Sequence, residues 1–126
     1  MNENEIAKLI VKAAIKIHRR LGPGLLESVY EKILAYELQQ IGLQVKVQEP
    51  IPITYDDVIF KEGFRADLIV NNKVIIELKA IKKIERIHFK ILLTYLRLSN
   101  LKLGLLINFN TELVTNGIKR VVNGII

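Results

Sequence analysis

Residues 74–80 read VIIELKA, an apolar run that contains one acidic and one basic residue. Side chains alternate between the two faces of a β-strand, so Ile75, Glu77 and Lys79 would share one face. The intervening positions form the other face, which is wholly apolar and is therefore predicted to pack against helices. The charged face lies toward the carboxyl end of the strand, where many α/β proteins bind ligands.

The preceding apolar run, residues 64–70 (FRADLIV), carries an acid of its own, Asp67. If residues 71–73 form a three-residue loop, Asp67 lies opposite Glu77, with their Cβ atoms roughly 5 Å apart. A two-residue loop would instead turn Asp67 toward the other face. Both loop lengths are compatible with the sequence, because the two Asn residues of the loop tolerate a left-handed backbone.

Two adjacent carboxylates in a half-buried site raise each other's pKa unless a cation joins them. Mg²⁺ is commonly held by one or two carboxylates together with water and phosphate oxygens. A neighbouring Lys can orient a water molecule or offset charge on a phosphate. Asp67, Glu77 and Lys79 thus form a candidate site for phosphodiester hydrolysis assisted by Mg²⁺ or Mn²⁺. The alternative is an ordinary ion pair between Lys79 and one of the acids at a sheet edge.

Apolar spacing predicts a helix over residues 3–20 and another over 25–41, separated by the Gly-Pro-Gly turn at 22–24. The helical period returns over residues 84–99. Its predicted inward stripe is Ile84, Ile87, Ile91, Tyr95 and Leu98. In the second helix the predicted inward residues are Leu26, Val29, Tyr30, Ile33, Leu34, Leu38 and Ile41.

Strands are predicted at residues 45–49, 58–61, 64–70, 74–79 and 103–109. Pro50 and Pro52 predict an edge or irregular strand after the first of these. The tail, residues 111–126, is compatible with a short helix or a final strand. The predicted fold is α/β, a central mixed sheet flanked by helices, with a right-handed parallel crossover from 74 to 109.

Glu27 begins the second predicted helix, directly after the Gly-Pro-Gly turn. An acid in a first turn interacts favourably with the helix dipole, and taken alone its position favours that role. Tyr30 lies three residues later, on nearly the same face. Glu27 is also a candidate third acid for the metal site.

Basic residues follow the VIIELKA strand closely: Lys82, Lys83, Arg86, Lys90 and Arg97. One interpretation is a solvated helix face. The other is a footprint for a phosphate backbone, because these residues would flank the candidate metal site. The chain has few aromatic residues, which argues against a base-stacking platform for single strands.

Length and composition limit the class of protein. The chain has 126 residues, 50% of them hydrophobic, so one folded domain over residues 1–126 is expected. It has no Cys, which excludes disulfides and thiolate metal sites and fits a reducing cytoplasm. No apolar run reaches the roughly 18 residues of a membrane span. A net charge of +6 and a pI of about 9.6 permit a polyanionic partner.

Residues 24–30, GLLESVY, fit the pattern GxxExxY, and Asp67 to Lys79 fit D-x₉-E-x-K. With IHRRLGPGLLESVYEKILAYEL and the later YLRLSNLKLGLLINF, these stretches resemble the GxxExxY protein family, which is placed in the PD-(D/E)xK nuclease superfamily. The resemblance extends from about residue 6 to 122. It implies a restriction-endonuclease-like core with two N-terminal helices.

The resemblance also implies roles by position. Asp67 and Glu77 would match the metal-binding acids, Lys79 the catalytic lysine, and Glu27 the helical acid near the metal. Gly24 and Tyr30 would match the remaining motif positions, without an assigned chemical role for Tyr30. One departure is Ile91, where related sequences usually carry Gln four residues before the Tyr at position 95. Because Ile91 falls on the predicted apolar stripe, packing is expected to account for it.

The sequence therefore predicts a cytoplasmic, metal-dependent nuclease that acts on DNA, with Mg²⁺ or Mn²⁺ as cofactor. The alternative is a nucleic-acid-binding or assembly module that keeps the fold without turnover. A protein-interaction domain is the third interpretation. The high apolar fraction of so small a chain points to a homodimer in that case.

Overall fold

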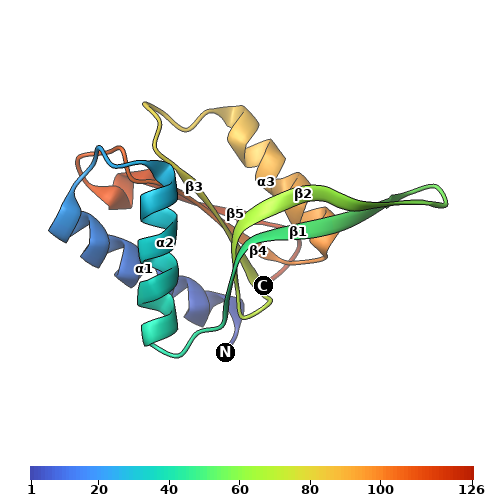
Figure 1. Ribbon diagram of the computed structural model, residues 1–126, viewed down its shortest axis with the longest axis horizontal. Helices are drawn as coiled ribbons and strands as arrows, with labels where there is room; N and C mark the ends of the chain where they lie inside the picture. Colours follow the sequence, from blue (N-terminus) through green and yellow to red (C-terminus); the bar gives the residue numbers. More distant parts are fainter.

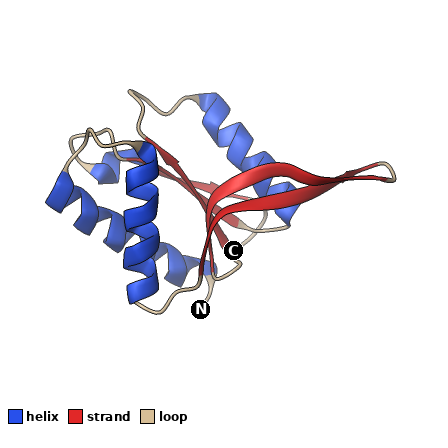
Figure 2. Cartoon of the chain, viewed as in Figure 1, coloured by secondary structure: helices blue, strands red, loops and turns tan.

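A five-stranded sheet in the order β1-β2-β3-β4-β5 organises the computed structural model, which describes residues 1–126 (Figures 1 and 2). β3 and β4 are parallel, and every other neighbouring pair is antiparallel, so the sheet is mixed as predicted. The elements in chain order are α1 (Glu3–Leu21), α2 (Glu27–Gln40), β1 (Val45–Tyr55), β2 (Val58–Val70), β3 (Val74–Lys79), α3 (Arg86–Ser99), β4 (Leu103–Asn108), the 3₁₀ helix η1 (Val114–Gly117) and β5 (Ile118–Val122).

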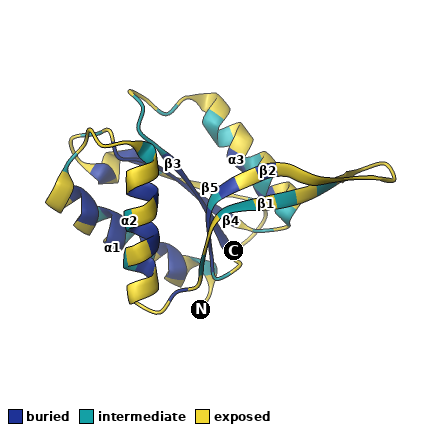
Figure 3. Ribbon diagram, in the orientation of Figure 1, coloured by how far each residue is buried: buried dark blue, intermediate teal, exposed yellow.

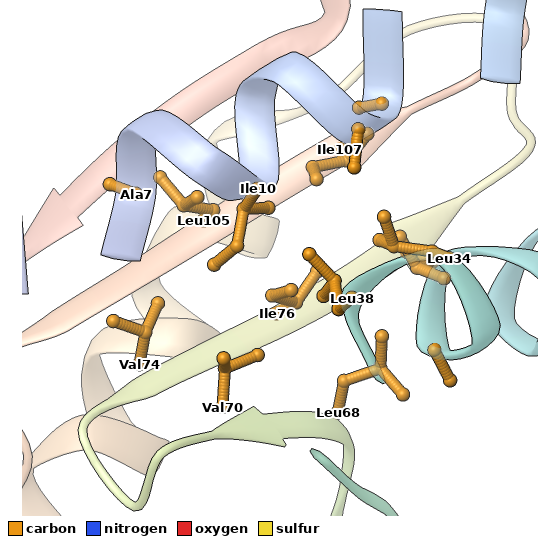
Figure 4. Packing of buried hydrophobic residues seen from close by; sticks show 14 of the residues in the cluster. Ala7, Ile10, Leu34, Leu38, Leu68, Val70, Val74, Ile76, Leu105 and Ile107 are labelled. Atoms are coloured by element: carbon orange, nitrogen blue, oxygen red, sulfur yellow. The ribbon is translucent and has the colours of Figure 1, made fainter. Parts of the chain in front are cut away.

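The helices cover both faces of the sheet, and the alternation within VIIELKA separates the two cores. Ile76 packs in the larger cluster, with residues of α1 and α2 such as Ile10 and Leu38 (Figure 4). Ile75 packs in the smaller cluster, with Leu92 of α3. Figure 1 shows α1 and α2 on one side of the sheet and α3 on the other. None of these helices combines the length and apolar character that a membrane crossing requires.

The first helix begins as its sequence predicts. The Asn2 side chain accepts a hydrogen bond from the backbone N–H of Glu5, and Glu5 accepts one from the backbone of Asn2. This reciprocal capping satisfies two backbone donors at the helix N-terminus.

The β1–β2 hairpin is longer than predicted. β1 continues through Pro50 and Pro52, which an edge strand tolerates because its outer N–H groups need no partner. β2 runs without a break through Gly63, where we predicted a gap between two strands. A Cβ at Gly63 would lie 2.4 Å from Ile53 Cγ2, so the glycine allows Ile53 of β1 to lie over it.

The hairpin extends past the rest of the sheet, and Figure 3 shows its far half as mostly exposed. Tyr55, Val58, Ile59 and Phe60 are all at least half exposed at its tip. The hairpin thus carries an apolar surface that nothing else in the chain covers.

The predicted inward stripe of α3 is partly wrong, because only Ile84 and Tyr95 of the predicted residues pack against the smaller cluster. The buried residues are Leu92 and Leu96, whereas Ile87, Ile91 and Leu98 are exposed. The helix has two adjacent apolar stripes, so its period alone does not select the inner one. Gly104 of β4 leaves the space that Leu92 fills, because a Cβ there would lie 2.8 Å from the Leu92 side chain.

The inward set predicted for α2 is also partly wrong. Leu26, Val29 and Ile41 are exposed. Leu26 and Ile41 flank the helix as its N-cap and C-cap, beyond the turns that pack on the sheet. Tyr30, Leu34 and Leu38 are buried as predicted.

The tail forms a strand. β5 pairs antiparallel with β4, with Ile107 opposite Ile118 and Leu103 opposite Val122. It covers the backbone edge of β4, which would otherwise present unpaired N–H and C=O groups.

Candidate active site

The turn between β2 and β3 decides which side chains meet. Val70 pairs with Val74, so the loop has the three residues 71–73, and Asn71 and Asn72 both adopt positive φ values of 51° and 54°. The register continues through the pairs Ile69–Ile75 and Leu68–Ile76, so Asp67 and Glu77 are the next residues along the two strands and lie beside each other. The three-residue alternative is therefore confirmed, and the two acids are neighbours.

Beyond Leu68 and Ile76 the two strands separate, and carboxylates replace the backbone ladder. The N–H of Leu78 donates to Asp67 Oδ2 at 2.9 Å. The N–H of Asp67 donates to Glu77 Oε1 at 3.4 Å. Each acid is thus bound to the backbone of the strand opposite its own, which fixes the pair at the carboxyl end of β3.

Glu27 reaches the same end of β3 from α2. Its Oε2 accepts a hydrogen bond at 3.2 Å from the N–H of Ala80, 53 residues away in the chain. Glu27 is therefore more than a first-turn acid beside the helix dipole. Acids from α2, β2 and β3 surround the last residues of β3.

The acids interact strongly in the absence of a cation. Burial, followed by the neighbouring charge of Asp67, raises the pKa of Glu77 from 4.5 to about 9, although the charge of Lys79 opposes this rise. Glu77 is only 8% exposed. The same two acids, after burial, raise the pKa of Tyr95 on α3. A hard divalent cation would remove this repulsion, so the oxygen donors of Asp67 and Glu77 fit Mg²⁺ or Mn²⁺.

No group of three or more His, Asp or Glu side chains is arranged to hold a metal ion by itself. A pair of carboxylates is nonetheless a normal protein share of a Mg²⁺ site, in which water and substrate phosphate provide the other ligands. The fit of the donor set thus rests on Asp67 and Glu77.

Lys79 forms no ion pair. The chain has two, Lys16–Glu37 and Glu62–Arg65, and both lie away from the acids at the end of β3. The sheet-edge ion pair considered as an alternative is therefore not formed. Lys79 and Glu77 instead line a small pocket of about 100 Å³ on the α3 side of the sheet.

Four side chains of α3 and one of β4 complete this pocket: His88, Ile91, Leu92, Tyr95 and Leu106. Ile91 is 41% exposed, so the expectation that core packing accounts for it is wrong. Ile91 instead lines the same pocket as Glu77. A larger groove of about 780 Å³ lies between α1 and α2, and none of the candidate site residues lines it.

Two residues near the site were not identified from the sequence, Glu31 and Gln48. Glu31 lies one turn after Glu27 on α2 and is 8% exposed. Burial raises the pKa of Glu31, and the charges of Asp67 and Glu27 add to the rise. The i, i+4 spacing from Glu27 could have indicated Glu31. Gln48 lies on β1, and no sequence signal marks it.

Tyr30 has a structural role that explains the spacing of the GxxExxY pattern. Its hydroxyl donates to the carbonyl of Gly22 at 2.6 Å and accepts from the N–H of Leu25 at 3.2 Å. Its ring stacks on Phe109, with centroids 4.4 Å apart. Gly24, with a φ of 108°, adopts a conformation that side-chain-bearing residues avoid. Tyr30 and Gly24 together hold the turn that places Glu27.

Tyr30→Phe is expected to lower the free energy of unfolding by about 1 kcal/mol, because a part-buried carbonyl and an N–H lose their partner while the ring stacking persists. Urea denaturation followed by circular dichroism measures the change. Tyr36→Phe is the control, since Tyr36 lies on the same helix and is 57% exposed. Equal stabilities of the two variants would contradict the role given to the Tyr30 hydroxyl.

The predicted basic residues are all exposed, and none forms an ion pair. Lys82 and Lys83 lie in the loop after β3, and Arg86 begins α3. Arg97 lies eleven residues further along the helix, roughly 16 Å from Arg86 along its axis. The cations therefore extend from the end of β3 along α3.

A family model described as the PD-(D/E)XK nuclease superfamily matches residues 4–121. The chain belongs to this superfamily. Three helices around a five-stranded mixed sheet, two of them N-terminal, agree with the restriction-endonuclease-like fold predicted from the sequence.

The crystal structure of SSO0001 resembles the chain with a TM-score of 0.58 and 22% sequence identity. The match covers 79% of this chain and 52% of that one, so the chain spans about half the length of SSO0001. At this identity the likeness shows a shared fold. Among curated proteins, none matches the chain significantly.

Proposed function

We propose that this protein is a metal-dependent nuclease of the GxxExxY family that hydrolyses phosphodiester bonds in DNA. The observation that carries the proposal is the adjacency of Asp67 and Glu77 beside a Lys79 that has no ion-pair partner. The superfamily of the chain supports it. A buried acid such as Glu77, whose pKa is strongly raised, is also typical of functional sites.

Asp67 and Glu77 would hold Mg²⁺ or Mn²⁺, with Glu27 assisting directly or through water. When bound, such an ion supplies Lewis acidity toward a phosphate oxygen and lowers the pKa of a bound water. The Lys79 ammonium would orient the attacking water or offset the negative charge that develops on the phosphate. The exposed cations after β3 and along α3 would hold the rest of the phosphate backbone.

The experiment is a cleavage assay on linear and circular DNA, single- and double-stranded, and on RNA, each with Mg²⁺, Mn²⁺ or a chelator. Metal-dependent product from DNA supports the proposal, and cleavage of circles would identify an endonuclease. Product from RNA alone would overturn the substrate assignment. No product from any polymer at high protein concentration would contradict nuclease activity.

The second candidate is a binding module with the same fold and no turnover. Ile91 beside Glu77 favours it, because an apolar side chain provides no polar support to the acids there. In such a module the apolar tip of the β1–β2 hairpin would serve contact with a second copy. Sedimentation equilibrium would then give the mass of a dimer, and a monomer mass would exclude that role.

The basic surface makes a prediction common to both candidates. Replacing Lys82, Lys83 and Arg86 together with Ala is expected to weaken DNA binding and to reduce the slope of log K against log salt by about two to three, since each lost phosphate contact lowers it by about 0.9. Fluorescence anisotropy at several salt concentrations measures the slope. The matched control replaces Lys8, Lys12 and Arg19 of α1, which are exposed and form no ion pair. Equal slopes for both triple variants would reject the assigned surface.

A further inference from the structure

We propose that Gln48 is a positioning residue that fixes the orientation of Asp67 for metal binding, and that Glu31 holds Gln48 in place. The inference rests on the proposed function, because it gives these two residues a role at the same site. Neither residue belongs to the D-x₉-E-x-K pattern or to GxxExxY.

Gln48 lies between two carboxylates. Its Nε2 donates to Glu31 Oε2 at 2.8 Å and to Asp67 Oδ1 at 3.1 Å. A carboxamide nitrogen has two hydrogens, so both bonds can form at once. The opposite orientation of the amide would set its oxygen against two acceptors, so the neighbours themselves determine which way the amide points.

The contact with Gln48 completes the support of Asp67. Oδ1 accepts from Gln48, and Oδ2 accepts from the N–H of Leu78. Both oxygens of the carboxylate are therefore held, and each keeps a lone pair for a cation. Partners of this kind, which orient a ligand without touching the metal, commonly change metal affinity 10- to 100-fold when they are removed.

The backbone of Gln48 is arranged for this contact. Its φ of 51° lies in the left-handed region, although it sits in a strand between the Val47–Leu68 and Glu49–Ala66 pairs. A residue with a side chain adopts this conformation at a cost in free energy, and such positions concentrate at functional sites.

The kink at Gln48 coincides with a change of face in β2. Leu68 packs in the cluster with α1 and α2, whereas Ala66, two residues before it, packs in the cluster with α3. Simple alternation would place both on one face. The change occurs at Asp67, so the two strands rotate where the Gln48 and Asp67 side chains meet beneath α2.

Glu31 holds the Gln48 side chain on the side away from Asp67. It is a buried carboxylate with no cation partner, and its hydrogen-bond partner is the Gln48 amide. A buried acid without a cation destabilises a fold. We infer that this acid is placed to anchor Gln48, because the Gln48 amide is the group that satisfies its buried carboxylate.

The test is the dissociation constant of Mn²⁺ alone, measured by calorimetry without nucleic acid. Gln48→Gly is the main variant, because glycine accepts the positive φ without strain while the side chain that carries the amide is lost. We expect it to raise the Mn²⁺ dissociation constant about 10- to 100-fold. The control is Gln39→Ala, which removes a glutamine side chain from an exposed position of α2 without placing a glycine inside the helix.

Two substitutions of Glu31 separate anchoring from packing. Glu31→Leu removes the acceptor and is expected to weaken Mn²⁺ binding as Gln48→Gly does. Glu31→Gln keeps an acceptor oxygen for the Gln48 amide and is therefore expected to bind Mn²⁺ more tightly than Glu31→Leu, with a dissociation constant close to that of wild type. In cleavage assays, excess Mn²⁺ should restore most of the rate of Gln48→Gly, whereas a general loss of structure would not respond to metal.

The outcomes distinguish the two proposals. Wild type that binds no Mn²⁺ would overturn the proposed function and this inference with it. Wild-type binding with unchanged dissociation constants in Gln48→Gly and Glu31→Leu would overturn the positioning role alone. Thermal unfolding of each variant shows that the comparison is made on folded protein.

Discussion

Lys79→Ala is expected to lower the rate of metal-dependent DNA cleavage by about 10²–10³-fold while the protein stays folded. Lys79 lines the pocket beside Glu77 and has no ion-pair partner, so its removal breaks no ion pair. Its ammonium is the one cation placed on the same strand face as Glu77. The loss should therefore appear in the chemical step, where charge develops on the phosphate.

Single-turnover cleavage at saturating Mn²⁺ measures this effect. Lys102→Ala is the matched control, because it removes the same charge from an exposed position that belongs neither to the candidate site nor to the basic surface. Its rate should stay within a few-fold of wild type at low salt. Equal cleavage rates in Lys79→Ala and wild type would contradict the assignment of Lys79 as the catalytic lysine.

Glu77→Gln is expected to abolish cleavage and, in the metal-free protein, to raise the free energy of unfolding by about 2 kcal/mol at pH 8. The amide is nearly the same size as the acid, and its oxygen can keep the bond from the Asp67 N–H. The substitution also removes the charge repulsion between residue 77 and Asp67, which contributes to the raised pKa of Glu77. Opposite effects on stability and activity are characteristic of a residue kept for its chemistry.

The same pKa predicts how stability depends on pH. Because the pKa of Glu77 in the folded protein is raised from 4.5 to about 9, the folded state binds a proton that the unfolded state has released. The stabilising contribution of this proton is fully present below pH 4.5 and is lost as pH rises through about 9. Urea denaturation of metal-free wild type and Glu77→Gln across this interval measures it. Parallel curves for the two proteins would contradict a raised pKa at Glu77.

The order of the elements was predictable because their periods are clear. The alternation of VIIELKA and the i, i+3, i+4 pattern of the first helix each admit one structure. The inward side of α3 was not predictable, since Ile87 and Ile91 on one stripe are as apolar as Leu92 and Leu96 on the other. Their separation depends on Gly104, which is close to Leu92 only in the folded protein.

The candidate site was predictable in part for a similar reason. Asp67, Glu77 and Lys79 lie on adjacent strands, so their proximity depended on one local unknown, the length of the loop at 71–73. Gln48 was not predictable, because its contact with Glu31 requires β1 and α2 to meet through a left-handed residue that no sequence pattern marks.

The most direct test of the account is calorimetric titration of Mn²⁺ into metal-free wild type and Glu77→Gln at pH 7.5, in two buffers of different ionisation enthalpy. If Asp67 and Glu77 hold the metal, wild type should bind Mn²⁺ and release close to one proton, because the pKa of Glu77 is about 9 before binding. Glu77→Gln should bind far more weakly and release none. Equal binding by both proteins, or binding by wild type without proton release, would contradict the site.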